Sequence, residues 1–379
     1  MPYFSRECGN PSSFHGMGRR ALAACERARE LVADLVGCNP SEIVFTSGAT
    51  ESNNTVLAWV ASLASSRRRI VTTAVEHKSI SEPCRSLAES GFEVIRLPVH
   101  SDGAVDLSAA ATAIDENTAV VTIQGANNEV GTLQPITEIA GLVRSAGTLF
   151  HCDGAQMLGK VPVSCSDAQF DYASFSGHKI YGPKGVGILY VRKGAPITPL
   201  LRGGGQEGAL RSGTLNVPGI VGIGEACRVA RYALLHDIEQ IGGVRCRFET
   251  EIVRALPTAR INASLADRLP GTTSLTIPGI PATMLMANVP HLCIAEGSAC
   301  SSGAPEPSHV LLAMGISRDD AECTVRISFG RNNSMSDADE AARSIARAAQ
   351  QLDSMIFGTA IPGKPRVERQ CCESARQKR

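Results

Sequence analysis

The chain has 379 residues, in which 37 Lys and Arg balance 37 Asp and Glu, and only 4% of the residues are aromatic. The balanced charge gives no electrostatic reason to expect nucleic acid or a membrane surface as a partner, and sparse aromatics argue against a stacking platform for single strands. The 13 cysteines include no Cys-x-x-Cys pair, so neither a disulfide framework nor a zinc ribbon is expected, and no metal site is predicted.

The length predicts two domains of unequal size. No signal-peptide segment opens the sequence, and no uncharged apolar run approaches the ~20 residues that a membrane span needs. We therefore expect a cytoplasmic protein without a membrane partner, in which most cysteines are small core residues.

Short β-rich runs alternate with helical patterns over the first 240 residues. Helices are expected at 18–37, 51–62, 80–89, 136–145 and 218–235 from their apolar spacing. Strands are expected at 43–46, 70–75, 94–99, 119–123, 148–152, 172–175 and 187–191. This alternation predicts an α/β fold whose mostly parallel, seven-stranded sheet lies between helices.

The pattern changes after about residue 240, where strands at 272–277 and 324–329 and an Ala-rich helix at 337–352 predict a smaller C-terminal α+β domain. We predict a large domain at 12–240, a small domain at 241–357 joined by residues 1–11, and a disordered tail at 358–379. A reactive pair at Cys371-Cys372 is the less favoured interpretation of the two cysteines in that tail.

Two polar residues follow predicted strands of the large domain, and each has a functional and a structural interpretation. Lys179 lies in the turn after strand 172–175, where its amine could form a Schiff base with an aldehyde cofactor, although a lone lysine there is more often a surface residue. Asp153 follows strand 148–152 and could either pair with a pyridinium nitrogen or cap the next helix.

A third feature is the run from Thr46 to Asn54, which passes from a strand through Gly48 into a helix start. Free backbone N–H groups at such a start suit a phosphate group, and an ordinary N-cap is the alternative. Each of the three signals is weak alone, but their order on successive strand ends favours a site for a phosphorylated aldehyde.

With these motifs in place, the chain resembles the NifS/IscS-like cysteine desulfurases, a branch of the class V aminotransferase-like, fold-type I pyridoxal-phosphate enzymes. The resemblance runs almost without a break from Gly9 to about Leu352. It rests on the segments 45–54, 76–78, 127–131, 151–156, 176–185, 203–207, 211–214, 297–303 and 325–330. It implies a fold-type I transferase fold and pyridoxal 5'-phosphate as the cofactor.

The resemblance also implies how the cofactor ring is held. Lys179 would carry the cofactor as an internal aldimine, and Asp153 would pair with the ring nitrogen. Gln156 would bond the ring hydroxyl, and His77 would lie over the ring and help with proton transfers. Asn128 would contact the cofactor or the substrate.

Other roles implied by the resemblance concern the phosphate, the substrate and a second subunit. The phosphate would be held by Ala49, Thr50, Ser176 and His178. Thr214 would reach the phosphate in a second subunit, which implies a homodimer. Arg326 would bind the α-carboxylate of L-cysteine, a task that suits a planar guanidinium.

Segment 297–303 consists mainly of Gly and Ser around Cys300, which is typical of a mobile loop. The resemblance implies that sulfur leaves L-cysteine through a cofactor ketimine, giving L-alanine and a persulfide on Cys300. The longer loop 301–308 is typical of the branch that delivers persulfide to an acceptor protein, such as an iron–sulfur scaffold or a thiolation carrier. Cys300 is also a candidate transient iron–sulfur ligand, whereas Cys293 and Cys323 are expected in the core.

The beginning of the chain departs from the family pattern. Family members carry a further short strand ahead of the position of Met1, and an asparagine in it helps to hold the substrate carboxylate. We therefore expect an N-terminally short member, with an exposed sheet edge and less support for Arg326. Two alternatives stay open: a selenocysteine lyase, which shares the cysteine-bearing loop, and a truncated protein of this fold that binds without turnover.

Overall fold

The computed structural model describes residues 2–63, 67–297 and 306–358. Its larger sheet has the strand order β1-β7-β6-β5-β4-β2-β3. The strands are β1 Ile43–Thr46, β2 Arg69–Thr73, β3 Glu93–Leu97, β4 Thr118–Gln124, β5 Leu149–Asp153, β6 Tyr172–Ser176 and β7 Gly187–Val191. Neighbours pair in parallel except at β7, which runs antiparallel to β1 and to β6. The predicted mostly parallel, seven-stranded sheet is thus confirmed.

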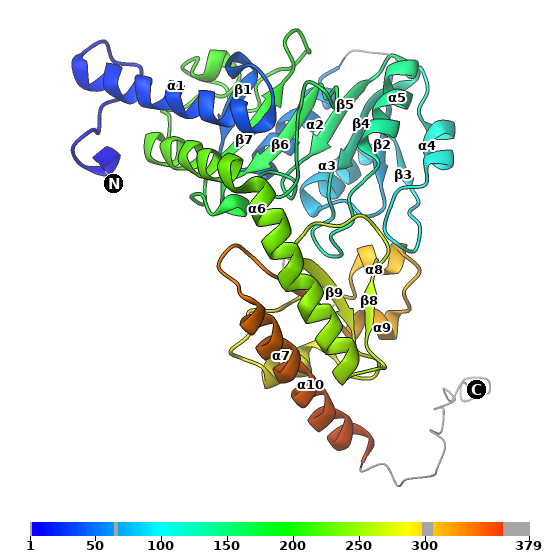
Figure 1. Ribbon diagram of the computed structural model, residues 1–379. Coiled ribbons are helices and arrows are strands. Elements are labelled where there is room, and N and C mark those ends of the chain that lie inside the picture. Colours follow the sequence, from blue (N-terminus) through cyan, green and yellow to red (C-terminus); the bar gives the residue numbers. More distant parts are fainter. Residues whose placement is uncertain (1, 64–66, 298–305, 359–379) are drawn as a thin grey trace, which may run out of the picture.

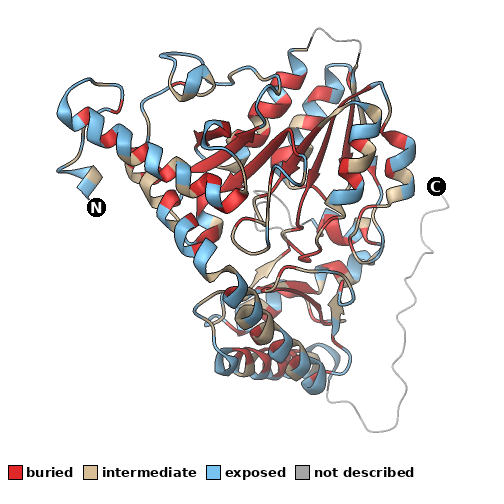
Figure 2. Cartoon of the chain, turned by 45° about the horizontal axis from the view of Figure 1, so that its top comes forward, coloured by how far each residue is buried: buried red, intermediate tan, exposed pale blue. Residues whose placement is uncertain are grey.

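Helices cover both faces of this sheet (Figure 1). One face packs against α1 Gly16–Val36, α4 Leu107–Ala113, α5 Ile136–Ala146 and the first part of α6 Val217–Ala255, and the other against α2 Ala49–Ala61 and α3 Lys78–Glu89. Successive residues of a strand point to opposite faces, so in β7 Ile188 and Tyr190 join the first core while Leu189 and Val191 join the second. The strands between the two layers are mostly buried, and edge strand β3 is the exception, with only Leu97 buried (Figure 2).

The smaller domain has an antiparallel sheet in the order β10-β11-β9-β8. Its strands are β8 Arg260–Asn262, β9 Thr272–Thr276, β10 Ala295–Glu296 and β11 Thr324–Ser328. Its helices are α7 Ala282–Asn288, α8 His309–Ala313, α9 Arg318–Glu322 and α10 Met335–Phe357. Short 3-10 helices occur at Pro2–Phe4, Pro40–Glu42, Gly177–Ile180 and Glu207–Ala209.

Helix α6 joins the two domains and corrects the predicted helix at 218–235, which is too short. Its buried stripe continues through Val244, Phe248 and Ile252 into the core of the small domain, where α10 packs against it. The helix therefore crosses residue 240 without a break, and the domain boundary placed there stays a prediction.

Some expectations on single residues are also corrected. Cys293 is exposed and Cys323 is half-buried, so neither is a fully buried core residue. Cys371-Cys372, with all of the tail after Gly358, lies outside the described residues. Among the helices that the structure describes, none is both long and apolar enough to cross a membrane.

Candidate active site

A cavity of about 600 Å³ lies at the carboxyl edge of the large sheet, a size within the usual range for small-molecule sites. The parallel strands end at this edge, so the residues that follow them meet there although they are far apart in the sequence. Of the residues singled out from the sequence, the cavity is lined by Ala49, Thr50, His77, Asn128, Asp153, Gln156, Ser176, His178, Lys179 and Arg326. Thr214 is exposed and does not line it, and Cys300 lies outside the described residues.

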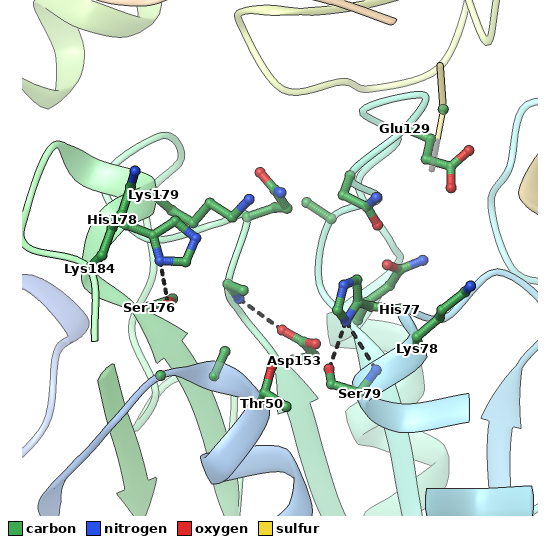
Figure 3. A pocket seen from close by; sticks show the side chains of 18 of the residues that line it. Thr50, His77, Lys78, Ser79, Glu129, Asp153, Ser176, His178, Lys179 and Lys184 are labelled. Carbon is green, nitrogen blue, oxygen red and sulfur yellow. Dashed lines mark hydrogen bonds between the residues drawn. The ribbon is translucent and has the colours of Figure 1, made fainter. Parts of the chain in front are cut away.

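Asp153 ends β5, Lys179 lies in the 3-10 helix that directly follows the neighbouring strand β6, and both face the same cavity (Figure 3). The two carboxylate oxygens of Asp153 accept the N–H of Ala155 at 3.0 Å and the side-chain amide of Asn53 at 2.8 Å. Burial raises the pKa of Asp153, and the hydrogen bonds and nearby charges offset this only in part. A cationic partner in the cavity would stabilise the carboxylate, which is what a pyridinium nitrogen supplies.

Another part of the cavity lining can bind an anion. Ala49 and Thr50 form the first turn of helix α2 and line the cavity. This N-terminal end carries the positive part of the helix dipole. Ser176 and His178 face this helix start, and Ser176 Oγ lies 3.0 Å from His178 Nδ1 in a hydrogen bond. A Cβ on Gly187 would lie 2.4 Å from Gly48 Cα, so only glycine lets β7 pack this closely against the turn that precedes α2.

Gln156 is held by a lysine that the sequence did not single out. Lys160 Nζ donates to Gln156 Oε1 at 2.6 Å, which commits the amide oxygen and leaves the amide N–H₂ as a donor. Burial, and after it the charges of Lys179 and Arg326, lower the pKa of Lys160 to about 7.

The small domain closes the cavity with Gly297, His309 and Arg326. Arg326 Nη1 donates to the carbonyl oxygen of Asn128 at 2.9 Å, and His309 Nε2 donates to that of Glu76 at 3.0 Å. This wall is therefore fastened to main-chain atoms of the large domain, while the guanidinium of Arg326 keeps other N–H groups for a carboxylate.

A family model described as Aminotransferase class-V matches residues 1–340. The chain belongs to this family.

Members of the class-V aminotransferase family with curated names are similar over most of this chain. Cysteine desulfurase IscS of Anaeromyxobacter sp. (strain Fw109-5) is 42% identical over 359 residues, which cover 94% of this chain and 89% of that protein. Cysteine desulfurase of Homo sapiens is 39% identical over 359 residues, covering 94% of this chain and 79% of that protein.

Solved structures of the family superpose on the chain as well. One named NIFS-like protein gives a TM-score of 0.87 at 40% identity, covering 92% of this chain and 94% of that one. Another, SspA in complex with cysteine, gives 0.77 at 36% identity, covering 87% and 93%. The expected fold-type I transferase fold and NifS/IscS-like family are confirmed.

Several polar residues at the edge of this class-V aminotransferase cavity have no role assigned from the sequence. Asn53, Glu76 and Glu129 lie inside matched segments, so those motifs hold a signal for them. Glu76 is buried, which raises its pKa to about 8, and it accepts the backbone N–H of Gln124 and the hydroxyl of Thr73. Ser79 and Lys160 lie outside the matched segments, and only the structure reveals their contacts.

Proposed function

We propose that the chain is a pyridoxal-phosphate-dependent cysteine desulfurase that converts L-cysteine to L-alanine and leaves a persulfide on Cys300. The observation that carries this proposal is that Lys179, the buried Asp153 and the start of α2 all line one and the same cavity. These supply an amine, an acid and an anion site at the places where an aldehyde, a pyridinium and a phosphate need them. The named relatives favour this activity over the selenocysteine lyase and over the subunit without turnover.

The cofactor would be held from several sides. When bound, it supplies an aldehyde for a Schiff base and a ring that withdraws electrons from the substrate's α-carbon. Asp153 would keep the ring nitrogen protonated, and the amide N–H₂ of Gln156 would donate to the ring hydroxyl. The phosphate would accept hydrogen bonds from the start of α2 and from Ser176 and His178.

The substrate would lie between the cofactor and the small domain. Arg326 would bind the α-carboxylate through the N–H groups that it does not use for Asn128. Asn128 itself lines the cavity at this point, beside the substrate or the cofactor. The Nζ atom of Lys179 faces the same space and is the group that we infer removes the α-proton.

The attachment of the Cys300 segment supports its role as sulfur acceptor. On one side of this segment Gly297 lines the cavity, and on the other Ser308 donates to the buried carboxylate of Glu129. The chain therefore enters and leaves this segment beside the cavity. Its attack on the substrate sulfur requires the thiolate form.

We further infer a homodimer that passes sulfur to an acceptor protein, for example an iron–sulfur scaffold. Thr214 is exposed and outside this subunit's cavity, which suits a residue that serves the phosphate site of a second copy. Arg211 Nε donates to Glu51 of α2 at 2.9 Å, which fixes the start of the segment that carries Thr214.

The experiment is to measure alanine and sulfide from L-cysteine with the purified chain, pyridoxal phosphate and a thiol reductant. The wild type should release both, and Cys300→Ala should bind the cofactor but lose at least about a hundredfold in sulfide release, as expected for a lost nucleophile. Cys293→Ala, which removes an exposed cysteine, is the matched control and should behave as wild type. No alanine from the wild type would reject the activity, and full sulfide release by Cys300→Ala would reject Cys300 as acceptor.

A further inference from the structure

A chain of hydrogen bonds joins the acid of the cavity to its histidine. The side-chain nitrogen of Asn53 lies 2.8 Å from Asp153 Oδ2 and 2.8 Å from Ser79 Oγ. Ser79 Oγ in turn lies 2.8 Å from His77 Nδ1, and the backbone nitrogen of Ser79 lies 3.1 Å from the same ring atom. Asn53 is fully buried, so none of its contacts is exchanged freely with water.

The direction of each bond follows from its chemistry. An ionised carboxylate only accepts, so the amide of Asn53 must turn its N–H₂ group toward Asp153. The same N–H₂ group donates to Ser79 Oγ, which leaves the hydroxyl proton of Ser79 free to point at His77. The backbone N–H of Ser79 is a donor under all conditions. His77 Nδ1 therefore accepts from both groups of Ser79.

This pattern fixes the form of the ring. A neutral imidazole carries one proton, and with Nδ1 accepting, that proton must be on Nε2. Protonating Nδ1 would break the bond from the Ser79 N–H and reverse the Ser79 hydroxyl. Burial lowers the pKa of His77. The charges of Lys179, His309 and Lys78 lower it further, whereas the charge of Asp153 raises it.

We propose that Asn53 and Ser79 are positioning residues that hold His77 as the neutral tautomer protonated on Nε2. In the proposed desulfurase, on which this functional step rests, His77 then acts as a hydrogen-bond donor to cofactor or substrate. Its only basic nitrogen is occupied by Ser79, so the proton from the substrate's α-carbon goes to the Nζ of Lys179. The tautomer itself is a property of the protein and can be measured without turnover.

The test is nitrogen NMR of the full chain labelled with ¹⁵N-histidine, both cofactor-free and loaded, with His77→Gln to assign the signals. At neutral pH we expect a protonated Nε2 and an unprotonated Nδ1. Ser79→Asp replaces the hydroxyl donor by an acceptor in the first turn of α3, where the helix dipole favours a negative charge, and should move the proton to Nδ1 and raise the pKa of His77 by about one unit or more. An imidazolium or a protonated Nδ1 in the wild type would overturn the proposal, as would an unchanged tautomer in folded Ser79→Asp.

Kinetics separate this proposal from the proposed function. Ser79→Ala keeps the backbone N–H but loses the hydroxyl, so kcat on L-cysteine should fall about three- to tenfold with a shifted pH profile, and Ser79→Thr should restore both. Asn54→Ala is the control and should keep both, because the half-buried Asn54 side chain donates to the carbonyl of Thr50 and takes no part in the chain from Asp153 to His77. A wild type with the expected tautomer and no alanine release would reject only the activity, whereas an active wild type with a protonated Nδ1 would reject only the positioning.

Discussion

The two walls of the cavity are built differently. On the large-domain wall several key side chains are held by residues of the same domain, as Asp153 is by Asn53, and Gln156 by Lys160. On the small-domain wall Arg326 and His309 are held by carbonyl oxygens of the large domain. One wall is therefore self-supporting, and the other depends on the contact between domains.

This difference suggests a division of work. The self-supporting wall holds the groups expected to grip the cofactor, which must stay in place through every turnover. The other wall carries Arg326 and the attachment points of the Cys300 segment, which serve the substrate. Substitutions in the large-domain wall should therefore change the binding or the absorbance of the cofactor. Substitutions in the small-domain wall should change the affinity for the substrate.

The largest effect is expected on the large-domain wall, from Asp153→Asn. A neutral amide does not stabilise a protonated ring nitrogen, so kcat should fall about 100- to 1,000-fold, equal to about 3–4 kcal/mol, with a changed absorbance band of the bound cofactor. Steady-state kinetics and absorbance spectra measure this. Asp167→Asn, at an exposed position, is the control, and a wild-type spectrum and kcat in Asp153→Asn would rule out the pairing.

A change on the small-domain wall, Arg326→Lys, should leave the cofactor band as it is. A lysine loses the bidentate geometry toward the carboxylate, so KM for L-cysteine should rise about 10- to 100-fold. Arg318→Lys, which alters an exposed ion pair with Glu322, should leave KM unchanged. Loss of the cofactor band at unchanged KM would contradict the division between the walls.

The smallest effect is expected from Lys160→Met, and it concerns stability. The fold lowers the pKa of Lys160 to about 7, so protonation of Lys160 is less favourable in the folded than in the unfolded state. At and below neutral pH the protonated side chain therefore destabilises the fold. This destabilisation disappears as the pH rises from about 7 toward the ordinary lysine value of 10.5. Cofactor-free Lys160→Met should thus melt about 2 °C or more above wild type at pH 7, and by less at pH 9.

The outcome would be different if Lys160 were stabilising as a cation. Lys193→Met, at an exposed lysine, gives the baseline for losing one charge. Thermal melts that show Lys160→Met below this control at pH 7 would contradict the lowered pKa.

The sequence predicts the residues that line the cavity better than it predicts the residues that hold them in place. Lys179 and Asp153 could be placed because they follow strands of a parallel sheet, whose carboxyl ends converge by a general rule. Asp153 is held by Asn53, which is 100 residues away, and Arg326 by the carbonyl of Asn128, 198 residues away. Such contacts leave no local pattern, because they depend on how the elements pack.

The same limit holds for the fold. Short elements such as α4, β8 and β10 hold too few residues to show a period, and they are missing from the predicted elements. The predicted end of α6 is wrong because its buried face changes from one core to another near residue 240 while the helix continues.

The central claim is that Lys179 is the lysine that carries the cofactor, and covalent trapping tests it most directly. Lys78 and Lys184 line the same cavity, and Lys160, with its lowered pKa, offers a neutral amine nearby. After the chain is loaded with pyridoxal phosphate and reduced with borohydride, peptide mass spectrometry should find the added mass on Lys179. The same mass on Lys78, Lys160 or Lys184, with Lys179 unmodified, would contradict the account.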